Sequence, residues 1–344
     1  MNKSRAENKI GVAVIVVLLV VTIFFTGLTG CQKSTKTPHY GKSTISYISE
    51  SSKKTYLNSY DIDTQEEIRY CVGNRKDVFD FLFDIYDGGC VAASNTYEVF
   101  VLDSTGILRY PDIIDRIVAI KKAGNNIVLI SQIDMETMKI VIYNSDFTQQ
   151  LYSEEIQGYY SQYSLITRER ELIFASYNSQ LQTSSLHVLS LKNDVRSSER
   201  REYPLLDIAA TMVPIKTDDE LYIYLNQRIL DSKSSIVIGS LFRVEEDSVL
   251  TKITQFDKLL TCGWYSDSEL YLLLGLNRTE LYLCSLDSFE EELLFTSEDN
   301  ETITRSYELS GLRYLVSDKG VFLLKNKSVM KLRSWESFLY NNYN

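Results

Sequence analysis

The chain has 344 residues and a formal net charge of −10; it is 44% hydrophobic and 24% charged, with only 15 glycines and 4 prolines. This is the composition of a folded globular protein, and it excludes a disordered chain, a collagen-like chain and a polytopic membrane protein. The acidic balance argues against nucleic-acid binding, which needs a basic surface, and two histidines leave little room for imidazole-based metal sites or triads.

The first 30 residues are typical of an export signal. Residues 1–9 carry Lys3, Arg5 and Lys9 against a single acid, and residues 10–30 contain no charged side chain. A basic start followed by an apolar stretch is the pattern of a secretory signal peptide. The alternative is an uncleaved membrane anchor, because ~20 uncharged residues are enough to cross a bilayer.

The residues directly after the apolar stretch favour the cleaved signal. Leu28-Thr29-Gly30-Cys31 resembles the lipobox of bacterial lipoproteins, in which an aliphatic residue and two small residues precede a cysteine. The resemblance implies cleavage before Cys31 and transfer of a diacylglycerol to its thiol. The protein is then expected at the cell membrane, lipid-anchored and facing the extracytoplasmic side. Residues 31–42 are read as a polar tether and residues 43–344 as the folded domain.

Residues 43–344 carry the period-two pattern of β-strands. Short apolar runs at 99–102, 140–143 and 281–284 end at turn residues. Apart from the last ten residues, no long segment carries a helical apolar stripe with caps. The pattern predicts an all-β domain, which has to protect its open sheet edges.

A strand–turn–strand unit recurs along this domain, and its turns lie ~40–50 residues apart, as do the blades of a β-propeller. The turns are at Asp63, Asp103, Asn144, Lys192, Glu245, Asp287 and Lys325. We therefore predict a β-propeller of seven four-stranded blades. By its period, and without a signature motif, the domain resembles the TolB-like and WD40-like extracytoplasmic propellers of bacterial lipoproteins. A β-sandwich or two smaller β domains are the alternatives.

The two ends of the domain indicate how the ring would close. The first unit holds only three strands, at 43–49, 55–62 and 67–72, and lacks its innermost strand, whereas the last unit, 302–333, is complete. We predict that the tail from Trp335 to Asn344 supplies the missing strand. The alternative is a short amphipathic helix that covers one face.

Four cysteines follow Cys31. Cys262 and Cys284 fall on the first and third strands of one unit, ~9.6 Å apart, which is too far for a disulfide. Cys71 and Cys90 fall on adjacent units, where a disulfide is the alternative to the buried thiols that we expect at all four positions. No CxxC spacing is present, so no metal or redox site is expected.

Catalytic motifs are absent from the sequence: it contains no Gly-x-Ser-x-Gly elbow, no HExxH and no phosphate-binding glycine loop. Acidic clusters at 218–219, 245–246 and 290–292 fall at predicted turns, where a solvated hairpin explains them. Asp61-Ile62-Asp63 lacks the glycine and the closing glutamate of a calcium loop and is read as a strand end. No cofactor or metal is predicted.

One segment is a candidate contact site. Tyr159, Tyr160 and Tyr163 lie between the third and fourth units, and such connections gather around the mouth of a propeller channel. Exposed tyrosines there would stack on a sugar ring or anchor a protein loop; the alternative is packing between blades.

The sequence thus predicts a surface lipoprotein that binds a protein, peptide or glycan of the cell envelope without catalysis, and that does not bind nucleic acid. One alternative is a propeller-type glycosidase or lyase, which would gather three or more acids at the channel mouth. The other is an accessory subunit of an envelope transporter or secretion complex, which would expose a large apolar patch.

Overall fold

The computed structural model describes residues 44–50, 53–74, 81–86, 89–94, 98–103, 106–110, 116–167, 170–192, 198–205, 211–231, 234–245, 249–288 and 290–334. These residues form β-strands, turns and bends, and none belongs to a helix that could cross a bilayer. The signal peptide, the lipobox with Cys31, the tether and the tail 335–344 lie outside the described residues, so their assignments remain predictions.

The strands follow one another with short connections and alternate in direction. They are β1 (Thr44–Glu50), β2 (Lys54–Asp61), β3 (Glu67–Asn74), β4 (Phe81–Tyr86), β5 (Gly89–Ser94), β6 (Val99–Asp103), β7 (Gly106–Tyr110), β8 (Arg116–Ala123), β9 (Asn126–Gln132), β10 (Thr137–Asn144), β11 (Gln150–Gln157), β12 (Tyr159–Ile166), β13 (Glu171–Asn178), β14 (Thr183–Ser190), β15 (Glu199–Leu205), β16 (Thr211–Lys216), β17 (Leu221–Asp231), β18 (Ser234–Val244), β19 (Leu250–Phe256), β20 (Leu260–Ser266), β21 (Glu269–Leu274), β22 (Glu280–Ser285), β23 (Glu291–Thr296), β24 (Ile303–Leu309), β25 (Leu312–Ser317), β26 (Gly320–Lys325) and β27 (Ser328–Ser334).

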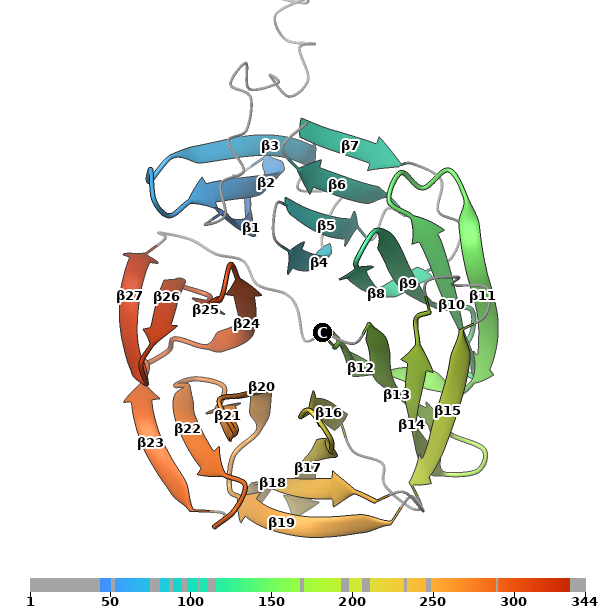
Figure 1. The fold of residues 1–344 in the computed structure, drawn as a ribbon, viewed down its shortest axis with the longest axis vertical. Coiled ribbons are helices and arrows are strands. Elements are labelled where there is room, and N and C mark those ends of the chain that lie inside the picture. The colour runs from blue at the N-terminus through green and yellow to red at the C-terminus, as the bar shows by residue number, and fades with distance from the viewer. Residues whose placement is uncertain are drawn as a thin grey trace, which may run out of the picture.

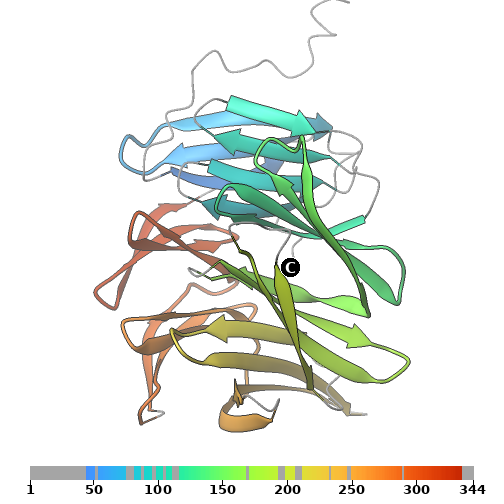
Figure 2. The same ribbon diagram turned by 45° about the vertical axis from the view of Figure 1, so that its right-hand side comes forward.

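The strands form seven separate sheets arranged in a ring around a central axis (Figures 1 and 2). Every sheet is antiparallel and pairs strands in chain order, and among the described residues six sheets have four strands while the first, β1–β2–β3, has three. The protein is a seven-bladed β-propeller, which confirms the predicted fold. The strands β4, β8, β12, β16, β20 and β24 are the innermost strands of blades 2 to 7 and line the axis.

The seven turns identified in the sequence are structurally equivalent. Each lies at the hairpin between the third and the outermost strand of its blade, as Asp103 does between β6 and β7 and Asn144 between β10 and β11. In blade 1 the equivalent turn, at Asp63, joins β2 to β3. By this equivalence the strands of blade 1 occupy the second, third and outermost positions.

Contacts between blades agree with this assignment. β1 packs beside β5, the second strand of blade 2, while the innermost strands β24 and β4 of blades 7 and 2 contact each other directly. Among the described residues, blade 1 therefore lacks its innermost strand, as the sequence predicted. The proposed donor of that strand, the tail 335–344, lies outside the described residues.

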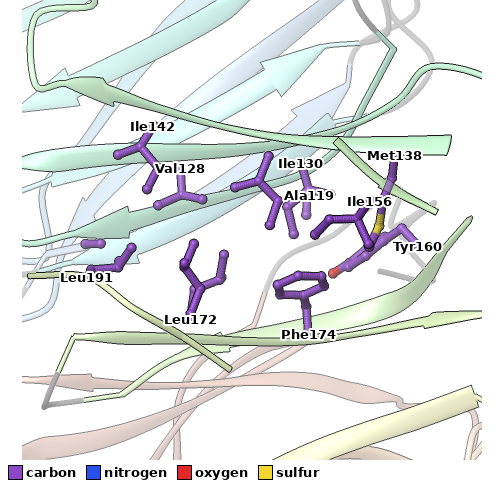
Figure 3. Packing of buried hydrophobic residues seen from close by; sticks show 13 residues of the cluster. Ala119, Val128, Ile130, Met138, Ile142, Ile156, Tyr160, Leu172, Phe174 and Leu191 are labelled. Carbon is purple, nitrogen blue, oxygen red and sulfur yellow. The ribbon is translucent and has the colours of Figure 1, made fainter. Parts of the chain in front are cut away.

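The hydrophobic core is divided among the interfaces between blades. Figure 3 shows the cluster between blades 3 and 4, where Ile130 and Met138 of blade 3 face Phe174 and Leu172 of blade 4. These side chains are completely buried, because alternate residues of each strand point to opposite faces of a blade and both faces are covered. Each blade is therefore held mainly by its two neighbours, so that the stability of the ring depends on its closure.

The structure confirms the predictions for the cysteines only in part. Cys90, Cys262 and Cys284 are free thiols, with Cys262 on β20 and Cys284 on β22, which confirms that these two do not pair. Burial raises the pKa of Cys90 to about 12 and that of Cys284 to about 11. Cys71 is disulfide-bonded, so the expectation of a thiol there is wrong, and Cys90 is not its partner.

Candidate functional site: one mouth of the central channel

All innermost strands run in the same direction along the axis, because each is reached from the outermost strand of the preceding blade. Their first residues therefore gather at one end of the channel, the amino mouth, and their last residues at the other, the carboxyl mouth. A cavity of about 590 Å³ lies at the carboxyl mouth, lined by residues such as Tyr86 of β4, Lys122 of β8, Lys216 of β16 and Tyr265 of β20. Its volume is that of a typical ligand site.

The lining of the cavity carries more positive than negative side chains, whereas the whole protein is acidic. Five cationic and three acidic side chains line it, whereas the chain as a whole has a net charge of −10. They are Lys121, Lys122, Lys216, Arg305 and Arg313 against Asp84, Asp218 and Glu308. The channel mouth is therefore a basic site in an acidic protein, which favours anionic ligands.

Two of the three acids form ion pairs. Asp84 lies 3.6 Å from the Lys121 ammonium and also accepts a hydrogen bond from the Lys122 backbone N–H, at 2.9 Å. Glu308 accepts a hydrogen bond of 2.8 Å from the Arg313 guanidinium. Asp84 and Glu308 are therefore engaged by cations of the protein itself.

Two of the lysines lack such an acid. The Lys122 ammonium lies over the ring of Tyr86, 5.2 Å from its centroid, and burial lowers the pKa of this lysine. Within the described part of the chain, neither Lys122 nor Lys216 forms an ion pair. The charge of Lys122 is thus partly desolvated; the Tyr86 ring and the more distant attraction of Asp103 compensate it only in part, because burial still lowers its pKa.

Trp264 lines the cavity from β20 but has no free ring face. It is only 8% exposed, stacks on Tyr271 at 5.2 Å between centroids, and carries the Arg313 guanidinium 5.2 Å from its ring centroid. A sugar ring needs an exposed aromatic face to stack on. Trp264 therefore shapes the wall of the cavity and positions Arg313.

Cys262 is the cysteine that lines the cavity, and its surroundings favour the protonated thiol. It lines the cavity beside Ser306, and burial raises its pKa. A thiol with a raised pKa carries little thiolate at neutral pH, and the thiolate is the nucleophile. Cys262 is therefore a poor nucleophile in this setting.

The three tyrosines predicted as a contact site are placed differently from one another. Tyr159 begins β12 at the amino mouth, is 42% exposed and packs edge-on against Tyr177. Tyr160 is only 7% exposed, belongs to the core between blades 3 and 4, and donates a hydrogen bond to Ser164. The side chain of Tyr163 lies outside the described set. The expected row of exposed tyrosines is therefore wrong at Tyr160, which packs between blades, while Tyr159 remains a candidate contact.

Tyr159 belongs to a group of exposed apolar side chains on the amino-mouth face, which we call the amino-mouth patch: Ile133, Met135, Tyr159 and Leu181. Met135 is 86% exposed and Leu181 70%. Their loops are tied together, since Gln180 donates a hydrogen bond of 2.6 Å to the Glu136 carboxylate and the Gly158 N–H donates one to the Glu136 carbonyl. Sequence patterning alone could not show that these loops meet.

One serine–histidine pair resembles part of a catalytic triad but is built the opposite way. His187 is completely buried on β14, with Nε2 2.7 Å from the Ser176 hydroxyl and Nδ1 2.9 Å from Arg200 Nη1. A guanidinium only donates, so Nδ1 accepts and the ring proton is on Nε2, facing Ser176. His187 therefore donates to the serine and cannot take its proton as a general base would.

The remaining acids behave as ordinary turn residues. Asp218, Asp219 and Glu290 are exposed at hairpins, as expected, and Glu291 and Glu292 are exposed at the start of β23. Asp61 accepts hydrogen bonds from the backbone N–H groups of Asp63 and Thr64, both at 2.9 Å, which is the geometry of a strand end closed by a turn. In the described parts of the chain, no group of three His, Cys, Asp or Glu side chains is arranged to hold a metal ion.

Comparison with known proteins bears on the fold. No family model and no curated protein matches the sequence. Among solved structures, the β-propeller domain of the Trilobed protease from Pyrococcus furiosus superposes with a TM-score of 0.55 at 8% identity, over 86% of this chain and 98% of that one. Acylaminoacyl peptidase from Pyrococcus horikoshii gives a TM-score of 0.51 at 9% identity, over 86% of this chain and 54% of that one.

A puromycin-hydrolyzing peptidase from Mycobacterium tuberculosis gives a TM-score of 0.51 at 12% identity, over 85% of this chain and 53% of that one. The likeness shows the propeller fold alone. The chain spans about half the length of these two peptidases. Because function resides in sites and many functions share this fold, their activity does not transfer to this chain.

Proposed function

We propose that this protein is a lipid-anchored extracytoplasmic lipoprotein whose propeller binds a protein, peptide or glycan of the cell envelope without catalysis. The observation that carries the binding role is the cavity at the carboxyl mouth, where six blades contribute side chains around about 590 Å³. A concave site with convergent charged groups, placed where a propeller ring is open to a partner, is suited to recognition. The lipobox at residues 28–31 supports the anchor.

The chemistry of the cavity supports binding over reaction. Two of its three carboxylates are held by cations, and its one thiol has a raised pKa. The serine–histidine pair of blade 4 is buried in the sheet, and His187 donates its proton to Ser176, so it does not activate the serine as a nucleophile. These side chains can hold a ligand through charge and hydrogen bonds.

Site-specific photo-crosslinking in cells tests this proposal. A benzoylphenylalanine in place of Tyr265, which lines the cavity, should give an adduct of defined mass. The matched control is the same residue in place of Leu293, which is exposed on the outermost strand β23 of the same blade. Equal labelling at the two positions, or none at 265, would contradict binding at the carboxyl mouth.

Each alternative has one observation in its favour. Three acids do line the cavity, as a glycosidase or lyase would require, and Asp218 is the one that forms no ion pair within the described residues. Loss of glycan cleavage in Asp218→Asn would support that role. The amino-mouth patch favours an accessory subunit, and a crosslink from position 135 in place of one from position 265 would point there.

A further inference from the structure

Two lysines at the carboxyl mouth set the chemistry of the ligand. Lys122 is the penultimate residue of β8 and Lys216 is the last residue of β16. Strand β12 lies between these two strands and packs against both. Both lysines line the same cavity, and neither forms an ion pair within the described residues, although Asp103 attracts the Lys122 charge from a greater distance. The cavity thus presents two separate positive charges on either side of one blade.

Burial makes these charges receptive to an anion. Lys122 is packed over Tyr86, and burial lowers its pKa although Asp103 attracts its charge, so the loss of hydration outweighs the attraction of that acid. Lys121, its neighbour on the same strand, already has Asp84. A ligand carboxylate placed beside Lys122 would replace the missing hydration, as charge-assisted hydrogen bonds do.

The type of cation favours carboxylates that are spread along a chain. Phosphate sites in proteins are commonly built from bidentate arginines or from helix N-termini. Here Arg313 is engaged by Glu308 and by the face of Trp264, and Arg305 donates a hydrogen bond to the Tyr307 hydroxyl. The described residues form no helix. Lysines are single point charges, and two of them on different blades suit two carboxylates on one extended segment.

Two of the five aromatic side chains that line the cavity offer no face to a sugar. Trp264 is 8% exposed with its ring covered, and Tyr160 is buried in the interface between blades 3 and 4. Neither offers a face for a pyranose ring.

We propose that the carboxyl mouth binds an acidic peptide segment, with Lys122 and Lys216 each receiving a carboxylate of the ligand. This proposal rests on the proposed binding function and names the chemistry of its ligand. It is consistent with a basic mouth in an acidic protein, since electrostatic attraction would direct such a segment to the mouth and repel it elsewhere.

The test uses the full chain in detergent and fluorescein-labelled hexaglutamate, followed by fluorescence anisotropy. We expect binding that weakens with salt, and a loss of about tenfold in affinity for Lys216→Gln and more for Lys122→Gln/Lys216→Gln, because each removes a charge-assisted contact. The matched control is Lys252→Gln on the outermost strand of blade 5, which removes one exposed charge far from the lining. Melting temperatures verify that the variants fold, and the single variant alters only a half-exposed side chain.

Three results would overturn the proposal. Equal affinity of Lys216→Gln and Lys252→Gln would place binding outside the cavity. Displacement of the peptide by inorganic phosphate but not by unlabelled hexaglutamate would indicate a discrete phosphate site. No binding of hexaglutamate, together with a crosslink from position 265, would leave the binding function standing and refute the acidic ligand.

Discussion

The buried His187 should make the stability of the propeller depend on pH. Burial lowers the pKa of His187 from 6.5 to about 4, and the Arg200 guanidinium adds to this because it donates to Nδ1, although Glu202 opposes it. The unfolded chain therefore binds a proton at a pH where the folded protein does not. The stabilisation is complete above pH ~6.5 and is lost as the pH falls toward the folded value.

The size of the effect follows from these two pKa values. With 6.5 in the unfolded chain and about 4 in the folded protein, His187 costs the folded state about 2 kcal/mol between pH 7 and pH 5, and about 3 kcal/mol once both states are protonated. Urea unfolding at the two pH values measures this loss. The variant His187→Gln, which stays neutral, should be less stable at pH 7 but should lose about 2 kcal/mol less than the wild type on going to pH 5.

The sequence offers a matched control, since its only other histidine is His39, which precedes the first described strand. His39→Gln should retain the pH dependence of the wild type. If His187→Gln and the wild type lost the same free energy between pH 7 and pH 5, the assignment of the sensitivity to this buried ring would be refuted, and titration of the carboxylates would have to account for it.

Three further outcomes are expected. Cys31→Ala should abolish labelling by a fatty-acid probe and leave an unprocessed precursor, whereas Cys71→Ser should keep the label. Deleting residues 335–344 should cost several kcal/mol, a large share of the ~5–15 kcal/mol of a typical domain, because blade 1 would keep an open inner edge, and an unchanged melting temperature would contradict closure by the tail. Gly158→Ala should cost about 2 kcal/mol in chemical unfolding, because this residue adopts a φ of 114° and an added Cβ would lie 2.9 Å from the Tyr177 carbonyl oxygen; the exposed Gly311→Ala, with φ of 76° but no atom within 4 Å of the added Cβ, separates strain from collision.

The amino-acid sequence by itself determined the architecture, because blade structure is local. A strand pairs with the next strand along the chain, so period-two patterning and a turn every ~40–50 residues were enough to locate seven blades. The same regularity placed Cys262 and Cys284 on strands that do not touch, and it revealed that blade 1 lacks its innermost strand. Each of these conclusions needed only residues within one blade.

The site depended on contacts between blades, which only closure of the ring creates. Lys122, Lys216 and Trp264 are far apart in the sequence, and each alone resembles an ordinary residue near a strand end. They meet because the innermost strands of six blades run in one direction and end at one mouth. Once the repeat had been aligned blade by blade, the charged residues near the ends of the innermost strands could have been compared, and this comparison would have singled out the two lysines.

Burial at the blade interfaces was likewise decided by tertiary structure. Tyr159 and Tyr160 are adjacent and chemically identical, but successive residues of a strand point to opposite faces, and only the face of Tyr160 is covered by blade 3. The direction of the proton between His187 and Ser176 was fixed by Arg200, which β15 supplies from the next strand. The sequence specified the strands and their order, whereas exposure, charge compensation and proton position followed from the neighbours that folding supplied.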